Sequence, residues 1–157
     1  MHLKIGVADT TFARVDMGSA AADELRAGAN FSIERVTVPG LKDLPVASKK
    51  LIEERGCGLV LALGMVGPKP ADKATAQVAS TALQSAQLMT NTHILEVFVH
   101  EEEARDGREL AWLMERRARE HARNALRMLT EPEEMVRRAG TGQREGFRDV
   151  GPLVASL

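Results

Sequence analysis

The segment from Leu59 to Leu63 is apolar at every position, and Gly64 and Gly67 follow it closely. An apolar run without polar alternation is typical of a parallel strand that is buried on both faces. We therefore expect this segment to be the central strand of an α/β sheet. Ligands of such sheets bind beyond the carboxyl ends of the strands, so the turn at residues 63–69 should form one wall of a site.

Three further segments have the pattern of strands, and helical patterns lie between and after them. The strands are expected at residues 2–8, 31–38 and 94–99. The helices are expected at residues 17–27, from 41–45 to about 54, at 71–90, from 106–109 to about 129, and briefly after 130. Asp16, Asp43 and Asp106 are the expected helix caps. This alternation predicts a three-layer α/β sandwich with a four-stranded parallel sheet and helices on both faces.

A single domain is expected over residues 1–157, a length that can bury a core without disulfides. The glycine-containing tail from about Gly140 either covers the site or is mobile. The helix at 71–90 is rich in alanine and serine, which predicts close packing against another element or a copy of itself. Trp112, beside the apolar stripe of the next helix, is expected to be a packing residue.

Composition narrows the classes of partner. The chain has 21 basic and 22 acidic residues, so no balance suited to a polyanion appears and nucleic acid is not an expected partner. No apolar stretch approaches the ~18 residues that a membrane span needs. The single cysteine, Cys57, cannot form an internal disulfide, which predicts a reduced, cytoplasmic setting. Cys57 precedes the central strand, away from the expected site, and receives no catalytic role.

Four turns should meet at the carboxyl edge of the sheet, at residues 9–14, 39–43, 63–69 and 98–101. Phe12 and Phe98, two of only five aromatic residues, lie on or beside these turns. The chain has no G-x-G-x-x-G after its first strand and no G-K-[ST], which argues against dinucleotide and nucleoside triphosphate sites. No Ser-His-Asp arrangement and no metal-ligand spacing stand out.

Several uncommon strings resemble a known family. Residues 38–45, VPGLKDLP, are similar to the V-P-G-A-F-E-[IL]-P turn of lumazine synthase, and residues 61–66, LALGMV, to its A-L-G-x-V strand end. The phosphate-binding G-x-T-x-H loop that follows in lumazine synthase is replaced here by GPKPAD at 67–72. The strings at 9–17, 62–65, 86–91 and 96–101 instead resemble the archaeal-type riboflavin synthase, a relative of lumazine synthase.

This resemblance implies a flavodoxin-like subunit in a homopentamer, with active sites between neighbouring subunits. It implies the dismutation of two molecules of 6,7-dimethyl-8-ribityllumazine to riboflavin and a ribitylamino-pyrimidinedione, with a magnesium requirement and no organic cofactor. The alternatives are lumazine synthase itself and a non-catalytic carrier of lumazine or flavin. A signalling receiver ranks last, because no acidic cluster surrounds an aspartate after the central strand.

The resemblance and the turn positions give a set of site residues. His100 is the candidate for proton transfer, since it ends a strand at the site edge and histidine is the residue type most used for proton transfer near neutral pH; the alternative is an exposed surface histidine. Substrate contacts are expected from Thr11, Phe12, Leu41, Lys42, Asp43, Leu63, Gly64, Met65 and Phe98. Metal ligands are unknown.

Each substrate contact has a structural alternative. Phe12 is expected to stack on a ring or else to belong to the core. Met65 is expected to present an apolar edge to the pyrimidine or else to belong to the core. Asp43 is expected to bind the ribityl chain, to cap a helix, or both, since a carboxylate has lone pairs for two partners. Lys42 is expected to be solvated. Phe98 either enters a neighbouring subunit's pocket or packs in the core.

Overall fold

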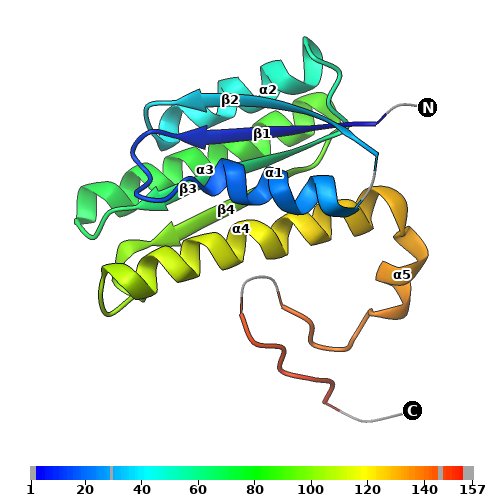
Figure 1. The fold of residues 1–157 in the computed structure, drawn as a ribbon. Helices are drawn as coiled ribbons and strands as arrows, with labels where there is room; N and C mark the ends of the chain where they lie inside the picture. The colour runs from blue at the N-terminus through cyan, green and yellow to red at the C-terminus, as the bar shows by residue number, and fades with distance from the viewer. Residues whose placement is uncertain (1–2, 29, 145–146, 154–157) are drawn as a thin grey trace.

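A four-stranded parallel sheet organises the computed structural model, which describes residues 3–28, 30–144 and 147–153. The strands are β1 (Lys4–Thr10), β2 (Ser32–Val38), β3 (Leu59–Val66) and β4 (Ile94–His100), in the order β2-β1-β3-β4. All neighbouring strands pair in parallel, so every strand ends at the same edge of the sheet (Figure 1). The predicted α/β sandwich is confirmed.

Helices cover both faces of the sheet (Figure 1). One layer consists of α1 (Met17–Gly28) and α4 (Gly107–Thr130), which pack together, and the other of α2 (Leu44–Glu53) and α3 (Pro70–Thr90). Two short 3₁₀ turns, η1 (Leu41–Asp43) and η2 (Glu101–Glu103), lie at the carboxyl edge. After α5 (Pro132–Arg137) the tail runs alongside α4 without helix or strand in its described residues.

Every residue of β3 is buried, and its two faces enter two different cores. Leu59, Leu61 and Leu63 belong to the apolar cluster under α1 and α4. Val60 and Ala62 belong to the cluster under α2 and α3. Side chains alternate between the faces of a strand, so a strand covered on both sides must be apolar at every position.

Several element boundaries differ from the sequence expectation. The first strand continues to Thr10, so Asp9 belongs to β1 and not to the following turn. His2, where that strand was expected to begin, lies outside the described residues. Asp16 and Asp106 cap α1 and α4 as expected, because their carboxylates accept the N–H of Ser19 at 3.0 Å and of Glu109 at 2.9 Å.

Two expectations about side-chain caps and packing were wrong. Asp43 precedes α2, but its carboxylate makes no bond to that helix; it accepts the N–H of Gly40 at 3.1 Å and so closes η1. Trp112 is 56% exposed and does not pack in the core. The guanidinium of Arg116 lies over its ring, 5.0 Å from the ring centre. Among the described residues no helix is long and apolar enough to cross a membrane.

The two faces of α3 differ in what they contact. Its buried face consists of Ala76, Ala79, Leu83 and Ala86, and these small side chains let α3 approach α2 and the sheet closely. Its opposite face exposes Val78, Leu88 and Met89 at 57%, 84% and 70%. No charged residue occurs between residues 74 and 90. The helix therefore presents an uncharged, partly apolar surface that nothing in the chain covers within the described residues.

Candidate active site

A cavity of about 420 Å³ lies at the carboxyl edge of the sheet. The turn after β1, the η1 segment, the end of β3 and the start of α3 form its walls. The lining residues are Phe12, Pro39, Gly40, Leu41, Lys42, Asp43, Met65, Gly67, Asp72 and Thr75. Five of them, Phe12, Leu41, Lys42, Asp43 and Met65, are residues that the sequence predicted for the site. The structure therefore brings together three turns that are far apart in the chain.

Three other cavities among the described residues are larger. The smallest of these, of about 470 Å³, lies between α4 and the described part of the tail. One, of about 730 Å³, lies beside the start of α4, and another, of about 620 Å³, lies between α3 and the amino end of β4. In parallel sheets of this type, ligands bind where strands end and helices begin. The cavity beside Phe12 meets that condition after three strands, and the 730 Å³ cavity meets it after β4 only. The mostly apolar wall of the Phe12 cavity, with a few polar groups, suits a flat heterocycle better than the largely charged lining of the larger cavity.

Phe12 stands at the rim of the cavity with its residue 49% exposed. The turn that carries it is fixed by backbone bonds, because Thr11 N–H donates to the carbonyl of Val38 at 2.9 Å and Phe12 N–H to that of Pro39 at 3.3 Å. The hydroxyl of Thr11 also reaches the Pro39 carbonyl, at 3.4 Å. A ring held by its backbone and left half exposed is not a core residue and is available for stacking.

Two carboxylates line the opposite wall. Asp43 accepts the N–H of Gly40, and Asp72 accepts the N–H of Lys69 at 3.1 Å, at the start of α3. A side chain on Gly67 would meet Asp72 Oδ2 at 2.4 Å, so only glycine permits this approach. Asp72 and Thr75 were missed by the sequence reasoning. The available signal was the capping spacing between Lys69 and Asp72 directly after the central strand.

Other predicted residues support the cavity from behind. Leu63 is fully buried in the core under α1 and α4 and does not line the cavity. A side chain on Gly64 would meet Leu41 Cδ2 at 2.3 Å and the ring of Phe98 at 3.6 Å. Phe98 is partly buried against the core under α2 and α3. Met65 is 1% exposed and belongs to the core while also touching the cavity, so both of its alternatives hold.

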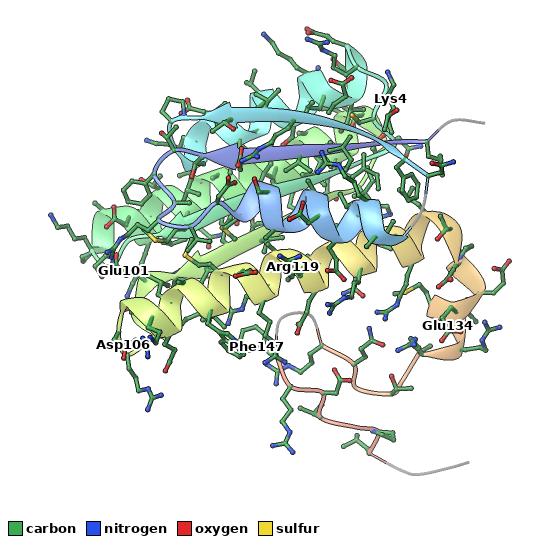
Figure 2. The ribbon with its side chains drawn as sticks, viewed as in Figure 1. Lys4, Glu101, Asp106, Arg119, Glu134 and Phe147 are labelled. Carbon is green, nitrogen blue, oxygen red and sulfur yellow. The ribbon has the colours of Figure 1, made fainter. Side chains whose placement is uncertain are left out.

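His100 ends β4 at the same edge but does not line this cavity. It pairs in register with Val66, the residue before Gly67 of the cavity wall. Figure 2 shows Glu101, its neighbour, at the edge where the strands end, far from Glu134. The position of His100 at the carboxyl edge is as expected, and its role in proton transfer stays a prediction.

An ion-pair network centred on the buried Asp9 holds the base of the Phe12 turn. Asp9, 4% exposed, accepts bonds from Arg35 Nη2 at 2.5 Å and from Thr37 Oγ1 at 2.6 Å. Arg35 Nη2 also lies 2.6 Å from Asp16 Oδ1. The hydrogen bond from Arg35 to Asp9 raises the pKa of the guanidinium. Asp9 is thus occupied in joining β1, β2 and the start of α1.

Two further groups bear on the chemistry. Burial raises the pKa of the Cys57 thiol to about 11, so this cysteine is protonated at neutral pH. In the part of the chain that the structure describes, no three His, Cys, Asp or Glu side chains gather in a way that could hold a metal ion.

Comparison with known proteins agrees with this geometry. Residues 2–133 match the family model described as 6,7-dimethyl-8-ribityllumazine synthase. The chain is 61% identical over 152 residues to a riboflavin synthase of Methanothermobacter marburgensis, covering 96% of this chain and 99% of that protein. It is 51% identical to a riboflavin synthase of Archaeoglobus fulgidus, covering 97% and 99%. A riboflavin synthase of Aeropyrum pernix is 46% identical, with 95% and 97% covered.

Replacing Asp16 with Asn should separate the two roles of its carboxylate at the base of the Phe12 turn. Hydrogen bonds from the Ser19 hydroxyl and N–H, together with Arg35, lower the pKa of Asp16 below its usual 3.8. A lowered pKa means that the charge stabilises the fold at neutral pH, and that this stabilisation is lost as the pH falls through the folded-state pKa. Asparagine keeps the cap, so Asp16→Asn should cost only about 0–1 kcal/mol at pH 7.

Urea unfolding of the wild type, Asp16→Asn and Asp16→Ala between neutral pH and the acid limit of the fold would measure this effect. The difference between wild type and Asp16→Asn should be constant at neutral pH and shrink below pH 3.8. Asp16→Ala should lose a further ~0.5–2 kcal/mol with the cap. If the difference in unfolding free energy between wild type and Asp16→Asn did not change with pH, the lowered pKa of Asp16 would be contradicted.

Proposed function

Because the chain belongs to the 6,7-dimethyl-8-ribityllumazine synthase family, we propose that this protein is a riboflavin synthase that dismutates two molecules of 6,7-dimethyl-8-ribityllumazine. One molecule donates a four-carbon unit and the other accepts it. The products are riboflavin and 5-amino-6-(D-ribitylamino)uracil, and together they contain all the atoms of the two substrates, so no oxidant or other co-reactant is needed. The reaction is a group transfer and the last step of riboflavin biosynthesis.

The observation that carries the proposal is the near full-length similarity to proteins named riboflavin synthase, at 46–61% identity. The geometry of the cavity supports it independently. Helix N-termini are natural phosphate sites because their N–H groups are unpaired. At the start of α3, Pro70 has no N–H and the Asp72 carboxylate occupies the N–H of Lys69. A neutral ribityl compound suits this site better than the phosphate-bearing substrate of a lumazine synthase.

The cavity residues have distinct proposed roles. Phe12 stacks on one heterocycle, and Met65 and Leu41 line the apolar wall. Asp43 accepts hydrogen bonds from ribityl hydroxyls with lone pairs that its bond to Gly40 does not use. The main contribution to rate is the alignment of two rings at reactive distance, up to about 7–11 kcal/mol in ideal cases.

Proton transfer contributes the remainder. The C7 methyl of the lumazine is unusually acidic, since its anion delocalises into the heterocycle, so only modest general acid–base help is required, about 100- to 10,000-fold. His100 is the proposed base. Because it ends β4 outside the walls of this chain's own cavity, it serves a site that a neighbouring subunit completes, while Phe98 packs behind this chain's own cavity.

A homopentamer is part of the proposal, and the exposed face of α3 supports an assembly of some kind. Val78, Leu88 and Met89 form an apolar surface on a helix segment without charge, and apolar surfaces of this kind mark contacts between proteins.

The proposal also includes a cytoplasmic location, supported by a lone, buried, protonated Cys57. Magnesium is included as a requirement to be tested, and no step is assigned to it because the described residues form no ligand cluster.

The proposed reaction is tested with purified protein and ribityllumazine alone. Riboflavin and the pyrimidinedione should appear in equal amounts when magnesium is present. Separate reactions without added magnesium, and with a chelator, test whether the metal is required. A lumazine synthase would form no riboflavin from this substrate. A carrier would bind the chromophore and release no second product. Either of those results, under warm conditions with magnesium, would overturn the proposal.

Replacing Phe12 with Ala should weaken ribityllumazine binding by about 1–3 kcal/mol, the usual worth of stacking a flat base on an aromatic ring. The fold should remain intact, since the residue is half exposed and its turn is held by backbone bonds. Fluorescence titration of the lumazine measures the affinity. Trp112→Ala is the matched control, because that ring is similarly exposed and lies outside the cavity. Equal affinities of wild type and Phe12→Ala would remove the stacking role.

Placing a charge on the exposed face of α3 should dissociate the assembly. Leu88→Asp puts a carboxylate on an apolar residue that is 84% exposed in the single chain. Light scattering should give the mass of five chains for the wild type and a smaller mass for the variant. Val136→Asp on α5, at a residue 74% exposed, is the control and should leave the mass unchanged. A wild type with the mass of one chain would contradict the pentamer.

A further inference from the structure

Three consecutive glutamates follow His100, and each pairs with a cation on a different element. Glu101 Oε1 lies 3.4 Å from Arg14 Nη1, on the turn after β1. Glu102 Oε1 lies 2.8 Å from Lys73 Nζ, in the first turn of α3. Glu103 binds Arg117 of α4. The η2 turn is therefore attached to three surrounding elements immediately after the residue that is the candidate for proton transfer.

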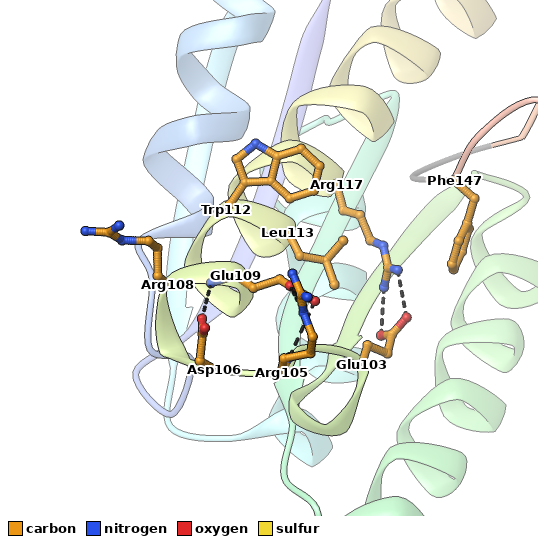
Figure 3. A pocket seen from close by; sticks show the side chains of 9 residues that line it. All are labelled: Glu103, Arg105, Asp106, Arg108, Glu109, Trp112, Leu113, Arg117 and Phe147. Atoms are coloured by element: carbon orange, nitrogen blue, oxygen red, sulfur yellow. Dashed lines mark hydrogen bonds and ion pairs between the residues drawn. The ribbon is translucent and has the colours of Figure 1, made fainter.

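The three pairs differ in burial and geometry. The side chains of Arg14 and Lys73 are 62% and 45% exposed, and exposed pairs of this kind contribute little to stability. The Arg117 side chain is 6% exposed. Its Nη1 and Nη2 each donate to one oxygen of Glu103 at 2.7 Å, a two-point contact that fixes the plane of the carboxylate (Figure 3). Of the three pairs, only Arg117–Glu103 fixes the orientation of the carboxylate in addition to attracting it.

The same carboxylate holds the backbone of His100. Glu103 Oε2, which accepts Arg117 Nη1, also accepts the N–H of His100 at 2.8 Å. Burial raises the pKa of Glu103, but the hydrogen bonds from Arg117 and from the His100 N–H lower it by more, so the group is ionised at neutral pH. A continuous path of charge-assisted hydrogen bonds therefore runs from α4 through Glu103 to His100.

The tail covers the outer side of this path. The ring of Phe147 lies 4.3 Å from the Arg117 guanidinium carbon and 4.8 Å from that of Arg144. Figure 3 shows Phe147 beside the Arg117–Glu103 pair, across from Trp112 and Leu113. An aromatic face over a guanidinium attracts the cation and removes water from it. Water competes less for the Arg117–Glu103 bonds as a result.

We propose that Arg117 is a positioning residue for the reaction, which fixes the orientation of His100 through the Glu103 carboxylate. The inference rests on the proposed function, in which His100 moves a proton. A base must be held within hydrogen-bond reach of the proton that it removes. The last residue of an edge strand has only one neighbouring strand to hold it. The buried contact from α4 supplies the missing restraint.

The test compares Glu103→Gln and Arg117→Lys with Glu102→Gln. Glutamine cannot accept both arms of the arginine, and lysine cannot make the two-point contact. Both variants should lower kcat by about tenfold or more, within the range of acid–base catalysis. KM should change by less than about twofold, because neither residue lines the Phe12 cavity in which the substrate is proposed to bind. Glu102→Gln removes an exposed charge from the same turn and should leave both constants unchanged.

His100→Ala separates failure of this inference from failure of the proposed function. If Arg117 acts through His100, then adding Glu103→Gln to His100→Ala should lower kcat no further, whereas a purely structural role would give additive losses. Full additivity, or Glu103→Gln and Arg117→Lys both with wild-type kcat, overturns the inference. An unchanged kcat in His100→Ala overturns the role of His100 itself, and a wild type without turnover overturns the proposed function. Arg117→Lys keeps the charge and the stem of the side chain, so it carries the test if Glu103→Gln does not fold.

Discussion

The burial of β3 on both faces is the constraint on which the rest of the structure depends. Its odd-numbered leucines enter the core under α1 and α4, and its even-numbered residues enter the core under α2 and α3. A shift of one residue in register would exchange the two sets and place Leu61 against the wrong layer. The register is therefore fixed, and with it the positions of the turns that follow β1, β2 and β3. The cavity forms because these turns begin at one common edge.

The sheet and helices could be predicted because hydrophobic period is a local property of the chain. The apolar run of β3, the strand patterns on either side and the caps at Asp16 and Asp106 needed no knowledge of distant residues. The cavity was predicted in large part by a single rule, that ligands of parallel sheets lie at strand ends. That rule gathered the turns that carry Phe12, Asp43 and Met65, and the resemblance to lumazine synthase selected these residues within them.

What could not be predicted depends on three-dimensional competition between partners. The carboxylate of Asp43 has two N–H groups within its reach by sequence, and the structure gives it to Gly40 instead of α2. The expected packing of Trp112 was wrong because a position beside the buried stripe of α4 leaves the residue 56% exposed, and the ring's neighbour there is the Arg116 guanidinium rather than the core. The bonds of Glu103 to Arg117, fourteen positions away, have no signature in a one-dimensional pattern. Such pairings are decided only when helices are docked.

The run of three carboxylates in η2 has a consequence for the order in which the chain assembles. Adjacent like charges repel, so residues 101–103 do not favour a tight turn by themselves. The cations that neutralise them arrive from the β1–α1 turn, from α3 and from α4. The turn thus becomes favourable only after the β1–α1 turn and the two helices α3 and α4 have taken their places around the sheet. A partly folded subunit would leave η2 unformed directly after His100, so the end of β4 would reach its final position only in chains that have completed their folding.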